Sequence, residues 1–481
     1  MNPLNALIAD LDNRHDRRNI FDGQSFSYHD LIQYSKRLTT WLLGEKCHCA
    51  MFTLKNSPLN IALYLAGWQA GIDLIPVNPR LIGHELIEII NRHPPSVLFI
   101  EKVQQNASLI QICQAKTIKV VVIDDPLKFL QALPKMPAPT ATENHQKQSI
   151  TYHISSGTGG YYQFYGHTLK QILDYAEKRQ FDVGLISGDR PLITLSVNHA
   201  YAFSYQLLPA LKLGLDLVIL PEFDLKKLTS AIQSHNITTL ALLPAMYYFL
   251  LDHIEKHFKT YSHQLRFLSI AGDQPNPKLM RKAINVLKVP LRNGIGMTEI
   301  YGYAQNITSA PAYHAVQLFE DTSVKIAPFK HGRKENKEKN PIGEIMIQSP
   351  MQPVNLKDAW LKSGDFGYLD SNHNLYFLGR IKDIIIKGGS NISPLELEHY
   401  LHEMAEITEV AIIGKKDLIW GEKICACIVT CRALSLNQIN RHLKTFVAPY
   451  KHIDEIFHFD TLPKNISGKI DRRLLKERID A

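Results

Sequence analysis

A glycine- and hydroxyl-rich segment at residues 155–160 (Ser-Ser-Gly-Thr-Gly-Gly) follows a short apolar stretch, residues 150–154. Its three glycines allow a tight bend, and the backbone N–H groups of such a bend can point together toward an anion such as phosphate. The segment is not a Walker-type loop, because no Gly-Lys-Ser or Gly-Lys-Thr follows it. On the pattern alone, a phosphate-binding loop and a glycine-rich surface turn are equally good interpretations.

A second candidate segment, residues 294–299, reads Gly-Ile-Gly-Met-Thr-Glu. A carboxylate directly after a glycine–hydroxyl turn is a suitable oxygen ligand for Mg²⁺ that carries the phosphates of ATP. The alternative is a helix N-terminus, with Thr298 as the cap and Glu299 in the first turn. Taken in isolation, the segment favours the helix N-terminus.

A third candidate pairs Asp365, in residues 363–367 (Ser-Gly-Asp-Phe-Gly), with Arg380, in residues 379–383 (Gly-Arg-Ile-Lys-Asp). An aspartate held in a tight turn can accept hydrogen bonds from both hydroxyls of a ribose, and a nearby arginine can bind sugar or phosphate. A hairpin with a salt bridge explains the two residues equally well.

The fourth candidate is Lys469, which stands in residues 462–470 (Leu-Pro-Lys-Asn-Ile-Ser-Gly-Lys-Ile) near the C-terminus. A lysine on a Ser-Gly turn close to the chain end is, by default, an exposed cation. Its chemistry therefore depends on what the rest of the fold brings to it.

The elements that must position these residues follow an alternating pattern through the first three quarters of the chain. Short β-branched apolar runs predict buried strands at residues 97–100, 120–123, 192–195, 217–220, 240–243 and 267–270. Amphipathic patterns between them predict helices at residues 225–235, 245–257 and 278–287. This alternation indicates an α/β fold with mostly parallel sheets flanked by helices. Residues 133–148 and 330–340 are polar and predict surface connections.

The pattern breaks near Gly379. Beyond it, we expect helices at residues 394–402 and 436–446 and strands at residues 410–413, 424–429 and 453–459. About a hundred residues with their own apolar pattern can form a small α+β domain. We therefore predict a large body, residues 1–379, and a small mobile C-terminal domain, residues 380–481, which we call the lid.

Composition excludes several classes of protein. The chain has 481 residues, 45% hydrophobic and 21% charged, with a formal net charge of +8, which is typical of an ordinary globular protein with a thinly spread basic surface. We expect no nucleic-acid partner, no membrane span and a cytoplasmic location, since neither a long apolar segment nor a basic-then-apolar N-terminus is present. The six cysteines lack the spacing of a zinc site and are interpreted as reduced packing residues.

The four segments, in this order and at these separations, resemble those of the adenylate-forming superfamily, which includes acyl-CoA synthetases, peptide-synthetase adenylation domains and luciferases. The resemblance covers residues 54–473, nearly the whole chain. Further family counterparts lie at residues 221–224, 271–273 and 343–345, at Asp417 with residues 421–422, and at residues 448–451. The ordered set of segments is specific to this superfamily. If the resemblance were accidental, the separate alternative interpretations of all the segments would have to be true at once.

The resemblance implies a role for each matching residue. Ser155, Ser156, Gly157, Thr158 and Gly160 would surround the β- and γ-phosphates of ATP, with Thr298 near the α-phosphate and Glu299 on Mg²⁺. The rest of the nucleotide would contact Asp273, Gly294, Ile295, Gly296, Asp365 and Arg380. His199 would lie beside the acyl carboxylate, and Lys469 would bridge it to the α-phosphate. Lys382 would be the hinge of the lid, and the pantetheine tunnel would receive Lys387, Gly388 and Gly389.

Two positions depart from the family pattern. Gln163 stands where the phosphate loop usually has a lysine, so one charged contact, worth roughly 1.5–3 kcal/mol when desolvated, is lost. Ile295 stands where an aromatic residue usually stacks on adenine, and it lacks the π-face contribution. We expect weaker ATP binding or slower adenylation from these two changes.

The resemblance therefore implies an AMP-forming acid–thiol ligase that makes an acyl-adenylate from ATP and a fatty or aromatic acid, and then a thioester with coenzyme A. Residues 387–396 resemble acyl-CoA ligases more than peptide-synthetase domains. Two alternatives remain open. One is a stand-alone adenylating enzyme that loads the phosphopantetheine of a carrier protein, and the other is a partly degenerate binding protein of the same fold.

Overall fold

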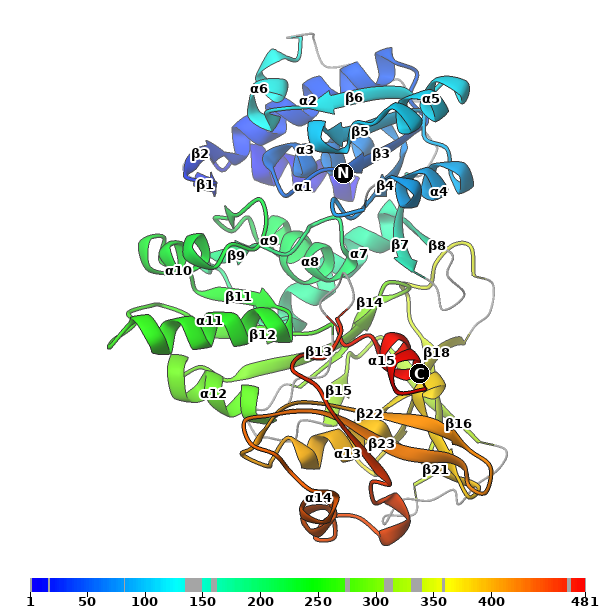
Figure 1. The fold of residues 1–481 in the computed structure, drawn as a ribbon. Coiled ribbons are helices and arrows are strands. Elements are labelled where there is room, and N and C mark those ends of the chain that lie inside the picture. The colour runs from blue at the N-terminus through cyan, green and yellow to red at the C-terminus, as the bar shows by residue number, and fades with distance from the viewer. Residues whose placement is uncertain are drawn as a thin grey trace.

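The computed structural model describes residues 2–15, 18–81, 83–134, 149–156, 162–272, 277–306, 315–329, 340–356, 360–464 and 469–480. Strands of these residues form three sheets, which follow one another from top to bottom in Figure 1, with the lid at the bottom. Helices cover the sheets of the body, so the α/β class expected from the sequence is confirmed.

The first sheet has the strand order β6-β5-β3-β4-β7-β8. Side chains alternate across its middle strand, so that Ala50 and Phe52 share a core with the helices of one face, whereas Cys49 and Met51 share a second core with those of the other. Burial on both faces is the usual state of a parallel sheet. Its strands are β3 (Cys49–Thr53), β4 (Asp73–Pro76), β5 (Val97–Glu101), β6 (Lys119–Ile123), β7 (Ile150–Ser156) and β8 (Tyr162–Thr168).

The last pair of this sheet, β7 and β8, is antiparallel. Ser155 and Gln163 are paired across it near the open end. This hairpin therefore carries the glycine-rich segment at its tip, where residues 157–161 lie outside the described part of the chain.

The second sheet begins with parallel strands and continues as an antiparallel one. Its parallel part contains β1 (Arg18–Phe21), β9 (Pro191–Ile193), β10 (Val218–Ile219), β11 (Thr239–Leu242), β12 (Phe267–Ile270) and β13 (Leu291–Met297), with β2 (Gln24–Ser27) at the edge. The antiparallel part contains β14 (Tyr301–Gln305), β15 (Ala315–Leu318), β16 (Ser323–Pro328), β17 (Gly343–Gln348), β18 (Leu361–Leu369) and β19 (Leu375–Arg380). The switch occurs at the β13–β14 turn, which holds Thr298 and Glu299.

The described helices of the body pack on these sheets. They are α1 (Pro3–Asp12), α2 (Tyr28–Gly44), α3 (Pro58–Ala70), α4 (His84–Arg92), η1 (Lys102–Gln104), α5 (Ala107–Ala115), α6 (Pro126–Ala132), α7 (Leu169–Asp182), α8 (Ala200–Ala202), the π-helix η2 (Phe203–Leu207), α9 (Leu208–Leu213), α10 (Leu225–Ser234), α11 (Pro244–His257) and α12 (Pro277–Leu287).

The lid has its own sheet and hydrophobic core. The sheet contains β20 (Ile385–Lys387), β21 (Ser390–Ile392), β22 (Ile407–Asp417), β23 (Gly421–Thr430) and β24 (Glu455–His458). The helices are η3 (Ile381–Asp383), α13 (Pro394–Leu401), α14 (Leu436–Leu443), η4 (Pro449–Lys451) and α15 (Arg472–Asp480). The last helix packs Leu475 and Ile479 on β22 and lies between the lid sheet and the body in Figure 1.

The predicted strands and helices of the first three quarters are present, each within a few residues of its expected bounds. Most of the two predicted connections, residues 133–148 and 330–340, lies outside the described part. Five cysteines are buried as expected, but Cys431 is exposed, so its interpretation as a packing residue was wrong. Among the described residues, no helix combines the length and the apolar character that crossing a bilayer requires.

Candidate active site

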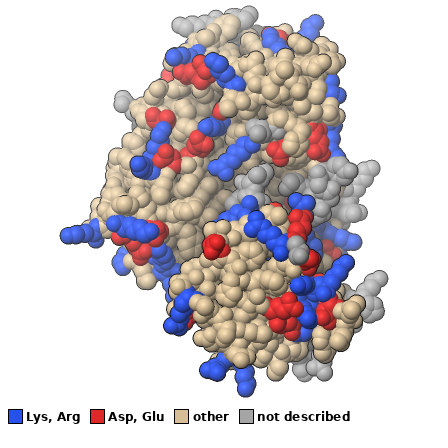
Figure 2. All heavy atoms as spheres, in the orientation of Figure 1, with Lys and Arg blue, Asp and Glu red and all other residues tan. Residues whose placement is uncertain are grey.

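A large cleft lies between the body and the lid and has a volume of about 1650 Å³. Its walls come from the β7–β8 hairpin, the α8–η2 helix, the β13–β14 turn, β18, β19 and the lid segments around η3, α13 and α15. Figure 2 shows Lys and Arg side chains beside the hollow between the upper and lower parts of the molecule. This volume has room for a nucleotide together with a second small molecule.

Ser155 and Gln163 line the cleft from the two strands of the β7–β8 hairpin. Tyr165 lies two residues after Gln163 on β8, and its hydroxyl donates a hydrogen bond to Gln163 Oε1. Ser156 ends β7, but nothing is described of its side chain. Gly157, Thr158 and Gly160 lie outside the described residues, so only the base of the expected phosphate loop is seen.

Thr298 and Glu299 lie in the turn between β13 and β14 and face the same cleft. They begin no helix, so the helix N-terminus favoured by the isolated segment was wrong. Burial raises the pKa of Tyr165, and the nearby Glu299 carboxylate, within hydrogen-bonding reach of its hydroxyl, raises it further. The first and second candidate segments therefore meet.

Two buried histidines make hydrogen bonds to the β13–β14 turn and to the first residue of β14. His167 Nε2 lies 2.8 Å from the backbone oxygen of Glu299, to which it donates, and His153 Nδ1 lies 3.0 Å from the hydroxyl of Tyr301. Burial lowers the pKa of His167 to about 4 and that of His153 well below its usual range, so both rings are neutral near pH 7. Tyr301 has a left-handed backbone (φ +61°), a strained conformation that these contacts stabilise.

Asp365 and Arg380 are directly paired residues of β18 and β19. Their ion pair has an Nε–Oδ1 distance of 2.8 Å, and the Asp365 side chain is buried, whereas Arg380 is exposed. The expected tight turn at Asp365 is instead a strand, and the hairpin with a salt bridge describes its backbone. Both side chains nevertheless line the cleft.

The electrostatics of Asp365 connect three of the candidate segments. Burial raises its pKa to about 6, and Glu299 raises it as well, whereas the charges of Arg380 and Lys469 act in the opposite direction. The Asp365 carboxylate therefore lies within electrostatic range of both the β13–β14 turn and the lid lysine.

Lys469 reaches the cleft from the lid. His199, on the body side, precedes α8 with its ring open to the cleft. The surrounding protein lowers the pKa of His199, and the Lys469 ammonium lowers it further. Lys469, His199 and Asp365 therefore line the same cleft, with Lys469 within electrostatic range of the other two, and its role as a bridging cation stays a prediction.

The lid residues expected to meet pantetheine do not line the cleft in this arrangement. Lys387 Nζ instead lies 2.7 Å from Asp454 Oδ1. Gly388 and Gly389 have positive φ angles of 56° and 77°, in the β20–β21 turn. Lys382, the expected hinge, is exposed in η3 and borders the cleft.

The body fixes the lid in this arrangement through α12. Lys278 Nζ lies 2.6 Å from the backbone oxygen of Met404 and 3.1 Å from that of Ile407. Arg281 NH2, one helical turn further, lies 3.0 Å from a carboxylate oxygen of Glu403. Sequence reasoning missed both residues, because nothing in α12 marks them as lid contacts.

Gly294, Ile295 and Gly296, which were expected to contact the nucleotide, line the cleft along β13. Glycine is required here, since a Cβ at Gly296 would lie 2.7 Å from the backbone oxygen of Tyr301. Asp273, assigned to the same wall, lies outside the described residues. Phe203, in the helix that follows His199, is fully buried in the body core and does not line the cleft.

Comparisons with known proteins agree with this geometry. The AMP-binding enzyme family matches residues 9–353, and the AMP-binding enzyme C-terminal domain matches residues 396–469. A 2-succinylbenzoate–CoA ligase of Oceanobacillus iheyensis is 25% identical, covering 94% of each chain. An indoleacetate–CoA ligase of Aromatoleum aromaticum is 28% identical over 94% of this chain and 92% of its own.

Among solved structures, ATP-bound MatB from Rhodopseudomonas palustris has the same fold, with a TM-score of 0.86 at 20% identity, covering 99% of this chain and 98% of its own. The family match spans well over half of the sequence and includes both body and lid. The expected adenylate-forming resemblance is thereby confirmed: the chain belongs to the AMP-binding enzyme family.

Proposed function

We propose that this protein is an AMP-forming acid–thiol ligase that joins a carboxylic acid to coenzyme A. In the first step the acid carboxylate attacks the α-phosphate of ATP, giving an acyl-adenylate and pyrophosphate. In the second step the thiol of coenzyme A attacks the acyl carbonyl, giving a thioester and AMP. The curated relatives, which are CoA ligases by name, support this reaction.

The observation that carries the proposal is that Lys469 lines the same cleft as His199 and Asp365 and lies within electrostatic range of both. A carboxylate and an α-phosphate repel each other, so their reaction requires positive charge where the two oxygens meet. A lysine delivered by the lid supplies that charge and, with the lid closed over the cleft, reduces access of water to the labile anhydride.

The other residues then have distinct roles. Asp365, assisted by Arg380, accepts hydrogen bonds from the ribose hydroxyls, and Thr298 contacts the α-phosphate. The Glu299 carboxylate, beside the Ser155 and Tyr165 hydroxyls, offers the oxygen donors that Mg²⁺ prefers. Bound there with ATP, Mg²⁺ would neutralise charge on the phosphate oxygens.

For the second step, we propose that the lid, residues 380–481, rotates about Lys382. This rotation would withdraw Lys469 and bring the β20–β21 turn, with Lys387, Gly388 and Gly389, toward the bound acyl group. Both glycines have positive φ angles, a backbone conformation that favours glycine. Because glycine has no side chain, neither residue would obstruct a thiol arm. Hinge motions of this kind need only a few residues to change conformation.

The proposal is tested by following pyrophosphate release from ATP and Mg²⁺ with a panel of carboxylic acids. We expect release with at least one acid and, after coenzyme A is added, the matching thioester by mass spectrometry. A thioester formed only on a holo carrier protein would replace coenzyme A as the acceptor. Absence of pyrophosphate with every acid, in the natural protein and in Gln163→Lys, would refute ligase activity.

A further inference from the structure

The cleft has a second end, formed by the helix that follows His199. Tyr201, Ser204 and Tyr205 line this end from α8 and η2, and Asn293 and Gly294 face them from β13. Tyr201 and Tyr205 are four residues apart on one helical face, with ring centroids 5.4 Å apart. If the acid carboxylate lies between His199 and Lys469, as the proposed function requires, its tail extends toward these two phenols.

Tyr205 is held in one position by the glycines opposite it. A Cβ at Gly294 would lie 3.0 Å from the Tyr205 hydroxyl, and one at Gly302 would lie 2.1 Å from a carbon of its ring. The residue is 5% exposed, yet its hydroxyl has no hydrogen-bond partner among the described residues. Leaving a buried hydroxyl unpaired costs about 1–3 kcal/mol, and a hydrogen-bonding group that binds at this end of the cleft would remove that cost.

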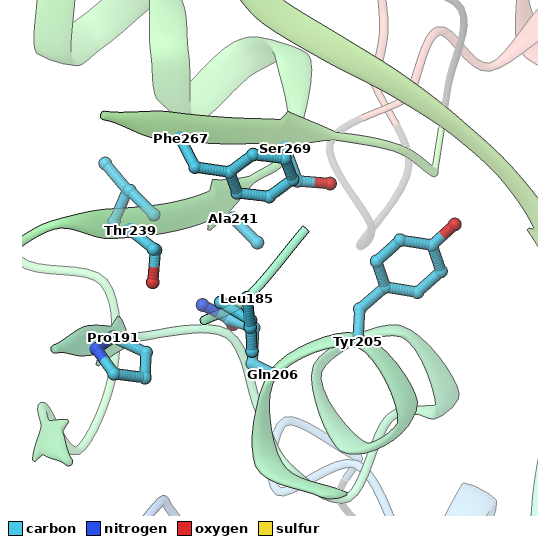
Figure 3. Close-up of a pocket in the computed structure, with 9 residues that line it drawn as sticks. Leu185, Pro191, Tyr205, Gln206, Thr239, Ala241, Phe267 and Ser269 are labelled. Carbon is cyan, nitrogen blue, oxygen red and sulfur yellow. The ribbon is translucent and has the colours of Figure 1, made fainter. Parts of the chain in front are cut away.

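A small cavity continues the polar character beyond Tyr205. It has a volume of about 10 Å³, room for about one water, and is lined in part by Gln206, Thr239 and Ser269. Gln206 Oε1 is buried and unpaired in the described structure, and the Ser269 hydroxyl lies 3.0 Å from that of Tyr201. Figure 3 shows Tyr205 rising from its helix toward the strand that carries Ser269.

No charged side chain of the described residues joins Tyr201, Ser204, Tyr205 and Asn293 at this end. The neighbouring strands do carry arginines, but Arg266 pairs with Asp189 and Arg292 lies over the Phe267 ring, and neither lines the cleft. A second carboxylate on the acid would therefore be buried without a cation, which is strongly unfavourable.

We infer that this cleft selects a compact aryl monocarboxylic acid whose far end carries an uncharged hydrogen-bonding group, and that Tyr205 is the residue that recognises that group. The glycine and alanine backbone at Ala200, Ala271 and Gly294 leaves a slot for a flat ring, and the two phenols close its end. This inference rests on the proposed function, because it places the acid by its carboxylate.

The test compares matched acids by kcat/KM for pyrophosphate release: benzoate, 4-hydroxybenzoate and terephthalate, and phenylacetate, 4-hydroxyphenylacetate and 4-carboxyphenylacetate. In at least one series we expect the hydroxyl acid to exceed the unsubstituted acid by about tenfold or more, and the dicarboxylic acid to be the poorest. Tyr205→Phe should reduce the hydroxyl-to-unsubstituted ratio about tenfold, since it removes only the recognising oxygen.

Tyr303→Phe is the matched control. Tyr303 is 1% exposed and its hydroxyl is also unpaired in the described structure, but it does not line the cleft, so the ratio should not change. A preference for the dicarboxylic acids, activity only with fatty acids, or a ratio unchanged in Tyr205→Phe would overturn the inference while leaving ligase activity intact. Failure with every acid, by contrast, would refute the proposed function.

Discussion

Under the proposed function, two residues should influence how the site binds ATP. Gln163 places a neutral amide at the base of the phosphate loop, and the Tyr165 hydroxyl orients it. Asp365 is a buried carboxylate whose pKa, about 6, is higher than that of an ordinary aspartate. We therefore expect Gln163 to change the charge offered to the phosphates and Asp365 to make ribose binding depend on pH.

Replacing Gln163 with lysine should strengthen ATP binding. A cation at this position gains a charged hydrogen bond to a phosphate oxygen, worth about 1.5 kcal/mol, so the KM for ATP should fall about tenfold. Gln114→Lys is the control, because this substitution adds the same charge at an exposed position of α5, outside the cleft. An equal effect of both substitutions would mean that overall charge, not the loop contact, controls ATP binding.

Lowering the pH should weaken ATP binding, because Asp365 becomes protonated. Its folded-state pKa is raised, so the carboxyl is protonated below about pH 6 and then accepts fewer hydrogen bonds from a ribose. The KM for ATP, measured between pH 5 and 8, should rise as the pH falls through 6. Asp365→Asn should bind ATP weakly throughout and lose this dependence, and an unchanged profile would separate Asp365 from ribose binding.

At the scale of elements, helix α12 connects the body to the lid through side-chain contacts. Two backbone oxygens of the lid accept hydrogen bonds from the half-buried ammonium of Lys278, and Arg281 pairs with Glu403. Burial lowers the pKa of Lys278, which indicates that its charge is partly removed from water. The proposed rotation of the lid would break these contacts, so they should favour the first step, in which Lys469 lies in the cleft.

Lys278→Ala should therefore slow adenylation but not thioester formation. Loss of about 1 kcal/mol from this arrangement corresponds to about a fivefold lower rate of pyrophosphate release. The rate of thioester formation from supplied acyl-adenylate should not fall. Lys282→Ala is the control, because Lys282, on the same helix, pairs with Glu255 inside the body. Equal slowing of both steps in Lys278→Ala would argue against a lid contact.

The elements also show what the sequence could and could not predict. β12 and α12 follow from local apolar patterns. β14 is buried along its whole length and has no alternation, so the antiparallel half of the second sheet was not predicted. Helix α15 was missed because only Leu475 and Ile479 are buried among mostly charged neighbours.

For the site, residue identities could be predicted but distances could not. The ordered segments pointed to Ser155, Glu299, Asp365 and Lys469, which the structure places around one cleft. Their mutual approach depends on the orientation of the lid, which no local pattern encodes. No local pattern predicts the unpaired Tyr205 hydroxyl either, because its isolation results from packing against glycines of strands that are distant in the sequence.

At the scale of the whole molecule, one lysine near the C-terminus lines a cleft whose other walls belong mainly to the body. If the lid rotates as proposed, it would control the reaction by moving a single charge. Lys469 should be needed when it is in the cleft, during adenylation, and dispensable once the lid has rotated. The two half-reactions should therefore differ in their need for Lys469.

The most direct test measures both half-reactions in Lys469→Ala, with Lys464→Ala as the control, because Lys464 is exposed and pairs with Glu409 outside the cleft. We predict that Lys469→Ala lowers pyrophosphate release by about 100-fold or more, as expected when charge stabilisation of a transition state is removed. Thioester formation from supplied acyl-adenylate should stay near the wild-type rate. Equal loss of both half-reactions in Lys469→Ala, or of neither, would contradict the account.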